Sequence, residues 1–468
     1  MSSTAEFLNY IDGEFIASQS GQAFLKYNPF TGEVLGKVTA SNAMDVIRAI
    51  QAAKRAQAEI EKWDLPQRAE LLRKIAAKLE EKAEDYAFQE ALHQGLPAEF
   101  VKEKSLVPAI KNFRLAAASV EALAKNQSRS LLPQPTGLIS ILLSWNLSLR
   151  LASERLAAAL AAGNVCLVKV SEFSPVTAQI LGEILSEVQA PKGLVQFIQG
   201  RGAEVGALMA AHPSIRAVNF VGKLTNAENI IKGALPQFKK VQIHASVKNS
   251  CLVLSDADFQ NGMEKILESF LVGQGQLGWN TTRLFFLEAT QKEFHEKLKE
   301  VLSLQKPATS PRDKTLWFPL ISEEALQGIE KKVQQLRSEG GKILAGGERL
   351  PQKGFFFQPT VSLDLSNCSE LQQEEVLGPL LIVTAVKYPH EMLKWANTGS
   401  YGHSAVIWGS AEKALKVAEK LDVGTVSLNS WLPEEVESGH RQSSFGNMQT
   451  GPWGRFYSDV KLLTGFES

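Results

Sequence analysis

The chain has 468 residues, which is more than one hydrophobic core usually organises, so we expect two or three domains. Its hydrophobic content of 44% and charged content of 21% are typical of a globular protein, and a formal net charge of zero gives no basis for binding nucleic acid or an anionic membrane. Three cysteines are too few for a disulfide framework, and the first residues show neither a basic nor an apolar leader, so we expect a reducing, cytoplasmic location.

The N-terminal part of the chain is expected to hold two short strands and a long helical region. Strands are predicted at 10–15 and, bounded by a turn, at 28–34. The pattern becomes helical over 41–100, with Ser41 as the candidate N-cap. The apolar tract 137–145 is too short to span a bilayer, so we expect a buried strand that leads into a helix.

Strands and helices then alternate regularly. Expected strands are 138–145, 164–168, 193–198 and 215–221, and expected helices are 149–162, 177–188, 204–211 and 226–234. This βαβ rhythm favours a doubly wound parallel sheet. A second α/β half follows, with expected strands at 250–254, 282–287, 360–363, 380–386, 404–408 and 425–429 and expected helices at 262–270, 293–302, 323–338 and 411–421.

The cysteines and histidines give no independent sign of a catalytic or metal site. Cys166 lies in an expected strand, Cys251 begins another, and Cys368 falls in a polar surface stretch. None of them has the spacing to histidine or acid that suggests a Cys–His pair. The histidines are scattered without metal-ligand spacing, so we expect no metal centre.

Six short motifs follow one another in the order found in a known enzyme family. They are Ser144-Trp145-Asn146, 161–172, Phe220-Val221-Gly222, 274–279, 374–379 and 424–429. From Tyr10 to Lys461 the chain therefore closely resembles the aldehyde dehydrogenase superfamily. The resemblance implies an α/β fold with a doubly wound Rossmann-like domain, a second α/β domain and a small bridging element that joins subunits.

The same resemblance suggests domain limits and an oligomeric state. We expect the Rossmann-like dinucleotide-binding domain at 1–112 and 136–246, the catalytic-type domain at 247–443, and the bridging element at 113–135 and 444–468. Only 127–136 separate the preceding helix from the next strand, which leaves little room for a long bridging hairpin. A homodimer is therefore favoured over a tetramer.

The nucleophile loop departs from the family pattern at its central residue. Family members present a thiolate from a Gly-Gln-x-Cys loop, and here Gly275-Gln276 is followed by Leu277 and Gly278. Glycine has no side chain, so it cannot form the thiohemiacetal from which hydride transfer starts. Asn146, which matches the side-chain donor of the family's oxyanion hole, is retained.

The base segment has changed as well. The resemblance places His244 where the family has a general-base Glu, and Ser246 and Val247 where it has a pair of glycines. A histidine can act as a base near neutral pH. We favour the simpler interpretation that His244 occupies a vacated pocket, because the nucleophile is lost too.

The cofactor positions are divided. The resemblance implies binding of NAD or NADP, with retained positions at Ser144, Trp145, Lys169, Glu172, Gly202, Gly206, Phe220, Gly222 and Glu375. Lys223 and Ala227 depart at the phosphate turn, and Leu377 replaces an aromatic ring beside the nicotinamide. Lys223 could pair with phosphate or fill the site, and we weigh filling above binding. Cofactor binding is expected to be weak or lost.

Three functional interpretations remain open. The first is a catalytically inactive family member with a residual nucleotide-binding or scaffolding role, and a possible small-molecule ligand. The second is an NAD(P)-dependent aldehyde oxidoreductase with an atypical site, and the third is a hydrolase that uses His244. We favour the first, and we also expect Trp279 and Asn280 to plug the space over Gly278.

Overall fold

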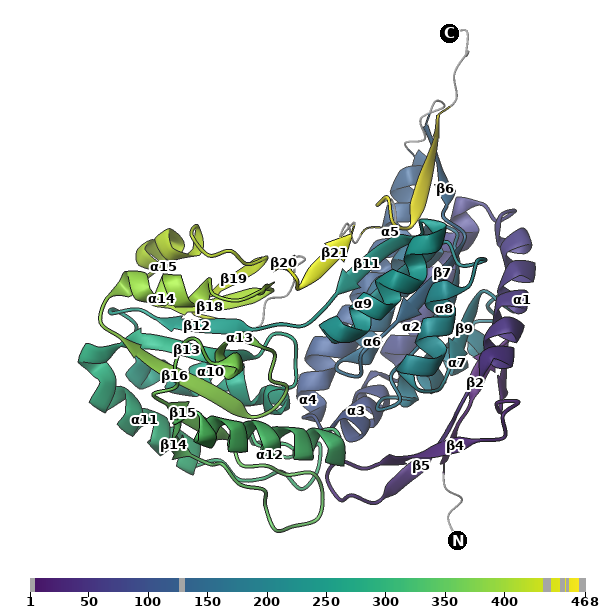
Figure 1. Cartoon of the computed structure of the whole chain (residues 1–468). Coiled ribbons are helices and arrows are strands. Elements are labelled where there is room, and N and C mark those ends of the chain that lie inside the picture. The colour runs from purple at the N-terminus through teal and green to yellow at the C-terminus, as the bar shows by residue number, and fades with distance from the viewer. Residues whose placement is uncertain (1–4, 126–130, 432–438, 447–450, 452–453, 463–468) are drawn as a thin grey trace.

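The computed structural model describes residues 5–125, 131–431, 439–446, 451 and 454–462. Figure 1 shows two α/β lobes side by side and a two-stranded arm that projects from the N-terminal lobe. Each lobe is built on its own sheet, of eight strands in the N-terminal lobe and seven in the other. The doubly wound α/β architecture predicted from the sequence is confirmed.

The predicted N-terminal strands are corrected in detail. Residues 10–15 form a hairpin of β2 (Asn9–Ile11) and β3 (Glu14–Ile16), because Asp12 and Gly13 adopt left-handed conformations that reverse the chain. Residues 28–34 are mainly a turn, in which the Asn28 side chain accepts the Phe30 amide. The turn connects the strands of a small separate sheet: β4 (Ala23–Tyr27) and β5 (Val34–Thr39), with β1 (Ala5–Phe7) on the far side of β5.

The helical region breaks into separate helices. Its first N-cap is Asn42 rather than Ser41, since the Asn42 side chain accepts the Met44 and Asp45 amides and Asp45 returns a contact to the Asn42 amide. The helices of this lobe are α1 (Ala43–Ile60), α2 (Leu65–Glu81), α3 (Ala83–Gln94), α4 (Ala98–Val101), α5 (Val107–Lys125), α6 (Ser148–Ala161), α7 (Val176–Glu187), α8 (Ala207–Ala211) and α9 (Leu224–Ala234).

The sheet of the N-terminal lobe has the strand order β21-β11-β10-β7-β8-β9-β2-β3. The five central strands run parallel, and the order changes direction at β7, as in doubly wound sheets that bind ligands at strand ends. Their bounds are β7 (Leu138–Leu142), β8 (Val165–Lys169), β9 (Val195–Ile198), β10 (Ala217–Val221) and β11 (Lys240–His244). The late strand β21 (Ser444–Gly446) returns to this sheet and pairs with β11.

The second lobe has the strand order β14-β15-β16-β13-β12-β18-β19. Its strands are β12 (Asn249–Val253), β13 (Thr281–Leu287), β14 (Lys342–Ala345), β15 (Thr360–Leu363), β16 (Leu380–Val386), β18 (Ser404–Trp408) and β19 (Thr425–Leu428). Its helices are α10 (Phe259–Leu271), α11 (Gln291–Ser303), α12 (Glu323–Ser338), α13 (Glu370–Gln373), α14 (Pro389–Ala396) and α15 (Ala411–Ala418). A short antiparallel ribbon pairs β17 (Tyr401–Gly402), which precedes β18, with β20 (His440–Arg441), which precedes β21.

The projecting arm pairs β6 (Leu131–Pro135) with β22 (Ser458–Leu462) in antiparallel register. The predicted bridging ranges are only partly in this arm. Residues 113–125 belong to α5, which packs on α2 and α6, and 444–446 belong to the N-terminal sheet. Residues 126–130, 447–450, 452–453 and 463–468 lie outside the described part of the chain. Within that part, no helix is both long and apolar enough to cross a bilayer.

Candidate functional site

The loop after α10 is held in a conformation that depends on glycine. Gly273, Gln274 and Gly275 all have positive φ, with Gly275 at 67°. A Cβ atom on Gly275 would lie only 2.2 Å from the Gly378 carbonyl oxygen. Two backbone segments therefore approach so closely here that a side chain at residue 275 cannot fit. This contact sets the position of the following residues, 276–280.

Gly278 stands in open space at the centre of the candidate site. Its carbonyl oxygen accepts the Asn249 side-chain amide at 2.8 Å, so β12 fixes the backbone of the loop. Apart from its chain neighbours Leu277 and Trp279, a Cβ built on Gly278 meets no described atom within 4 Å, and the residue does not have a positive φ. The backbone would therefore accept a residue with a side chain, and the missing nucleophile is a feature of the sequence rather than of the loop geometry.

The expected plug over Gly278 is corrected for Asn280, which is turned into the protein, whereas the plug by Trp279 stays a prediction. The half-buried Trp279 packs against the core of the N-terminal lobe, and the Arg150 guanidinium lies 5.0 Å from the centre of its ring. Asn280 is buried beneath the loop, where its side chain accepts the Leu277 amide and donates to the Ser269 and Val272 carbonyls. Asn280 thus supports the loop through these hydrogen bonds, and Trp279 anchors it by packing against the N-terminal lobe.

The structure brings Asn146 to the nucleophile loop, as the resemblance implies. The Asn146 side-chain nitrogen lies 3.4 Å from the Gln276 carbonyl oxygen, and its oxygen accepts the Ser144 hydroxyl at 2.6 Å. Leu147 is in the left-handed conformation, and Gln94 accepts its amide. The elbow before α6 is thus fixed from α3, so the amide of Asn146 is presented toward the loop.

The cysteines do not replace the missing nucleophile. Cys166 and Cys251 are fully buried in β8 and β12, and burial raises the pKa of both thiols, that of Cys251 to about 12. Cys368 is exposed near Ser366, whose hydroxyl accepts its amide, and it is not part of the nucleophile loop. The prediction that Cys166 is a core residue is confirmed by its burial.

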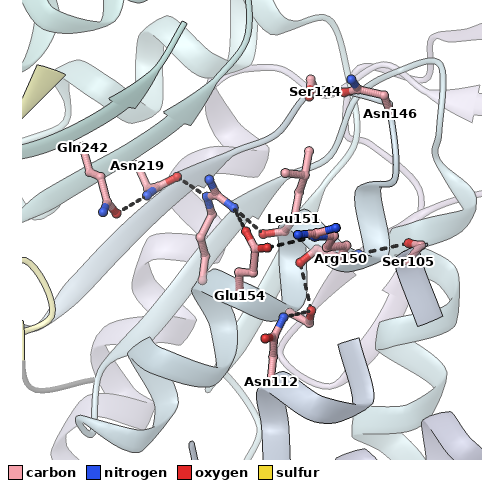
Figure 2. A network of polar contacts seen from close by, with 11 residues as sticks. Ser105, Asn112, Ser144, Asn146, Arg150, Leu151, Glu154, Asn219 and Gln242 are labelled. Carbon is pink, nitrogen blue, oxygen red and sulfur yellow. Dashed lines mark hydrogen bonds and ion pairs between the residues drawn. The ribbon is translucent and has the colours of Figure 1, made fainter. Parts of the chain in front are cut away.

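His244 is the last residue of β11 and lies near the buried Arg155. Burial, with the positive charge of Arg155 and with His403 nearby, lowers the pKa of His244 well below its usual value. Figure 2 shows Arg150 beside Glu154, with Asn219 and Gln242 at the other end of the network. Arg155 of α6 joins the two parts, since it contacts Glu154 and donates to the Asn219 side-chain oxygen. His244 is therefore neutral at pH 7, a state that can accept a proton and adds no positive charge beside Arg155.

The low pKa of His403 predicts a specific loss of stability in acid. Burial lowers its pKa from 6.5 to about 4, so the unfolded chain binds the proton more readily than the folded protein. The stabilisation is complete above pH 6.5 and is lost as pH falls toward 4. We expect His403→Gln to reduce the loss in unfolding free energy between pH 7.5 and pH 5 by about 2 kcal/mol. Urea unfolding at both pH values measures this, and equal losses in the two proteins would contradict it.

The carboxyl end of β8 carries a paired acid and base. The ammonium of Lys169 lies 2.9 Å from the Glu172 carboxylate, and the lysine side chain is only 4% exposed. Burial lowers the pKa of Lys169, whereas Glu172 opposes that shift. Burial alone would raise the pKa of Glu172, but Lys169 and the Gly202 amide outweigh it, so its pKa is lowered. Glu172 is therefore ionised at pH 7, and its pair with Lys169 offers an acceptor and a donor that suit the two hydroxyls of a ribose.

The glycine-rich turn completes this corner. Gly202 is exposed at the start of a short π-helical turn that ends at Gly206, and a Cβ on Gly202 would lie 3.7 Å from the Lys169 nitrogen. Its bare backbone leaves room for a ligand beside Lys169. Gly206 is buried against Leu142, which is a packing role.

The phosphate turn before α9 is open to solvent. Lys223 is the N-cap residue of α9 and its side chain is exposed, so the structure does not support the expectation that it fills the site. Gly222 lies under the ring of Phe220, since a Cβ there would come within 2.7 Å of that ring. Ala227 is buried in the first turns of α9. The positive charge of Lys223 and the positive end of the α9 helix dipole therefore lie close together, and both attract an anion.

Glu375 is held by residues of the chain itself. One carboxylate oxygen accepts the Ser246 hydroxyl at 2.8 Å, and the other accepts the Val247 amide at 2.9 Å. Burial raises the pKa of Glu375, while these contacts and the charge of Lys223 act against the rise. Leu377, two residues further on, is half-buried. The retained acid is therefore engaged within the protein at the end where the resemblance places a nicotinamide ribose.

Sequence reasoning missed the part played by three residues. Ser246 was noted only as a lost glycine, and Asn249 and Glu154 were not singled out as supports of the site. Only Ser246 carried a signal, because a hydroxyl in place of glycine adds a new donor and acceptor. The contacts of the other two come from residues distant in sequence. Among the described residues, no three potential metal ligands gather at one point.

Comparisons with known proteins agree with this geometry. The model of the aldehyde dehydrogenase family matches residues 15–463. The 2-aminomuconic semialdehyde dehydrogenase of Bos taurus is 29% identical, with 97% of each chain covered. The chain is similar to an NAD+ complex of aldehyde dehydrogenase from Bacillus cereus, with 26% identity, a TM-score of 0.91 and coverage of 98% and 96%. It is also similar to the lactaldehyde dehydrogenase of Escherichia coli, with 26% identity, a TM-score of 0.89 and 98% of each chain covered.

Proposed function

We propose that this chain, which belongs to the aldehyde dehydrogenase family, does not oxidise aldehydes and keeps a residual nucleotide-binding or scaffolding role. One observation carries the proposal: the residue at the centre of the nucleophile loop, Gly278, has no side chain, although a Cβ there would meet no described atom outside its chain neighbours. Asn146 still presents its amide to the loop, but an oxyanion hole needs a nucleophile that creates the oxyanion.

The residual role is supported at the carboxyl end of β8, where the resemblance places the adenosine. Lys169, Glu172 and Gly202 form a charged corner suited to ribose hydroxyls, and Lys223 is exposed at the N-cap of α9. One solved relative is an NAD+ complex, so NAD or NADP is the ligand class that this chain would take. The contacts of Glu375 argue for weak binding at the nicotinamide end. Titration calorimetry with NAD and NADP tests this role.

If a dinucleotide binds, its nicotinamide supplies a hydride acceptor, and this chain would orient it through few groups. Lys169 and Glu172 would hold the adenosine ribose, and Lys223 would meet a phosphate. Glu375 can serve the second ribose only after it leaves Ser246 and Val247. The chain's residues therefore bind and orient one end of the ligand better than the other.

The hydrolase alternative has one observation in its favour. His244 is neutral at pH 7 because burial lowers its pKa, so it could activate a water molecule. Against this, Arg155 is close enough to lower that pKa further, which reduces the basicity that general-base catalysis needs. Release of p-nitrophenol from p-nitrophenyl acetate, compared between the wild-type protein and His244→Ala, separates the two functions, and we expect no difference.

We also propose that the protein is a homodimer in a reducing compartment. Val460 and Leu462 of the arm strand β22 are 62% and 65% exposed, which is unusual for apolar side chains on a projecting ribbon. The three cysteines are free among the described contacts, as expected in reducing surroundings.

Gly278→Cys is expected to fold normally and to place a reactive thiol in the site. The space for a Cβ is open and φ is not positive, so the free energy of unfolding should change by less than about 0.5 kcal/mol. In a Cys368→Ser background, whose remaining thiols are buried, the new cysteine should be the one that reacts rapidly with Ellman's reagent. We expect no aldehyde oxidation from this variant, since His244 and the contacts of Glu375 remain. An unreactive thiol would show that the loop is closed.

A further inference from the structure

Ser246 connects the two lobes beside the candidate nucleotide site. It lies in the segment between β11 and β12, and its hydroxyl accepts the Leu224 amide at 2.9 Å. The same hydroxyl donates to Glu375, which is 129 residues away in the sequence and belongs to the second lobe. Leu224 is the first residue of α9, so one hydroxyl joins the N-terminus of that helix to the acid on the opposite lobe.

The neighbouring contacts hold this arrangement in place. Ser246 is 5% exposed, and its carbonyl oxygen accepts the Ser443 hydroxyl at 2.9 Å. The Ala245 amide donates to the Ser443 carbonyl, so the segment is fixed on the side of β21 as well. The Val247 amide takes the second oxygen of Glu375. Three contacts from adjacent residues of one segment therefore fix both the acid and the helix amide. We call Leu224, Ser246, Val247 and Glu375 the inter-lobe contact.

We propose that the Ser246 hydroxyl competes internally with a dinucleotide, so that the candidate nucleotide site selects a nucleoside monophosphate over a dinucleotide. This inference rests on the proposed nucleotide role. A ligand that extends past the phosphate turn must free the Leu224 amide and the Glu375 carboxylate from the Ser246 hydroxyl. Such a ligand binds only those molecules in which both groups are free, so its apparent affinity is reduced. A nucleoside monophosphate can use Lys169, Glu172 and Lys223 without disturbing them. Ser246 is thus a specificity-determining residue.

The test uses AMP and NAD as probes with the full-length protein. Ser246→Ala removes the hydroxyl and keeps the Cβ atom, and Ser250→Ala is a matched control that removes a buried hydroxyl with no described partner. We expect Ser246→Ala to tighten NAD binding by about tenfold, with the AMP dissociation constant unchanged within about twofold. Ser250→Ala should change neither. Equal changes for AMP and NAD, or no change in NAD binding, would overturn the proposed selection.

A second measurement does not depend on nucleotide binding. Amide hydrogen exchange at single-residue resolution reports whether the Leu224 amide is protected in the ligand-free protein. An exchange rate of the Leu224 amide that is at least about tenfold higher in Ser246→Ala than in the wild-type protein supports the inter-lobe contact. Equal exchange rates in the two proteins overturn it. If the wild-type protein binds neither AMP nor NAD, the residual nucleotide role fails. The internal competition is then still supported if Ser246→Ala binds NAD, and overturned if it does not.

Discussion

Gly275→Ala is expected to be the most destabilising single substitution in the candidate site, at about 4 kcal/mol. Two costs add. A non-glycine residue at φ 67° costs about 1–2 kcal/mol, and the new Cβ would lie 2.2 Å from the Gly378 carbonyl oxygen, so backbone must move at a further cost of about 1–3 kcal/mol. Urea unfolding followed by far-UV circular dichroism measures the change.

Gly278→Ala is the matched control for this prediction. It makes the same chemical change three residues along the same loop, where the Cβ meets no described atom within 4 Å other than those of its chain neighbours. We expect a change of less than about 0.5 kcal/mol. Similar losses of stability in the two variants would mean that the loop does not have the conformation described, and that the open space beside Gly278 does not exist.

Asn280→Ala is expected to destabilise the protein by about 3 kcal/mol. The Asn280 side chain is 1% exposed and bonds the Leu277 amide and the Ser269 and Val272 carbonyls. Alanine leaves these groups unpaired next to the C-terminal end of α10, and each buried unpaired group costs about 1–3 kcal/mol where water does not reach it. Chemical unfolding gives the value directly.

The control for Asn280 is Asn229→Ala, on the exposed face of α9. Alanine favours a helix interior, so we expect a change of no more than about 0.5 kcal/mol in either direction. A loss below about 1 kcal/mol in Asn280→Ala would contradict the supporting role and would favour the original expectation that this residue faces the site.

The sequence predicts the fold well because the spacing of apolar residues indicates which helices and strands are buried. The strands at 380–386 and 404–408 and the helix at 323–338 have the predicted bounds in the structure, since each has a strong apolar pattern with clear ends. The expectation at 28–34 failed because Asn28 and Gly32 favour a turn even beside apolar residues. Helix α14, which was not predicted, is short and begins at Pro389.

The candidate site is less predictable, because its contacts join residues far apart in the chain. The motifs located Asn146, Gly278 and Glu375, but the pairing of Ser246 with Glu375 depends on how the two lobes meet. A filling role was expected for Lys223 because Ala227 replaces a nearby glycine, and for Trp279 because of its size. Their positions are decided by the exposure of the α9 N-terminus and by the ring contact with Arg150. Side-chain identity does not carry such information.

The central claim, that the chain cannot oxidise aldehydes because residue 278 has no nucleophile, is tested most directly by the rate of NAD(P)H formation. Purified wild-type protein is assayed with short, long and aromatic aldehydes and with both NAD and NADP, beside a variant in which Cys166, Cys251 and Cys368 are replaced by serine. The account predicts no rate above the enzyme-free control for either protein. Turnover by the wild-type protein would contradict it, and turnover that survives all three replacements would show that the site uses a nucleophile other than cysteine.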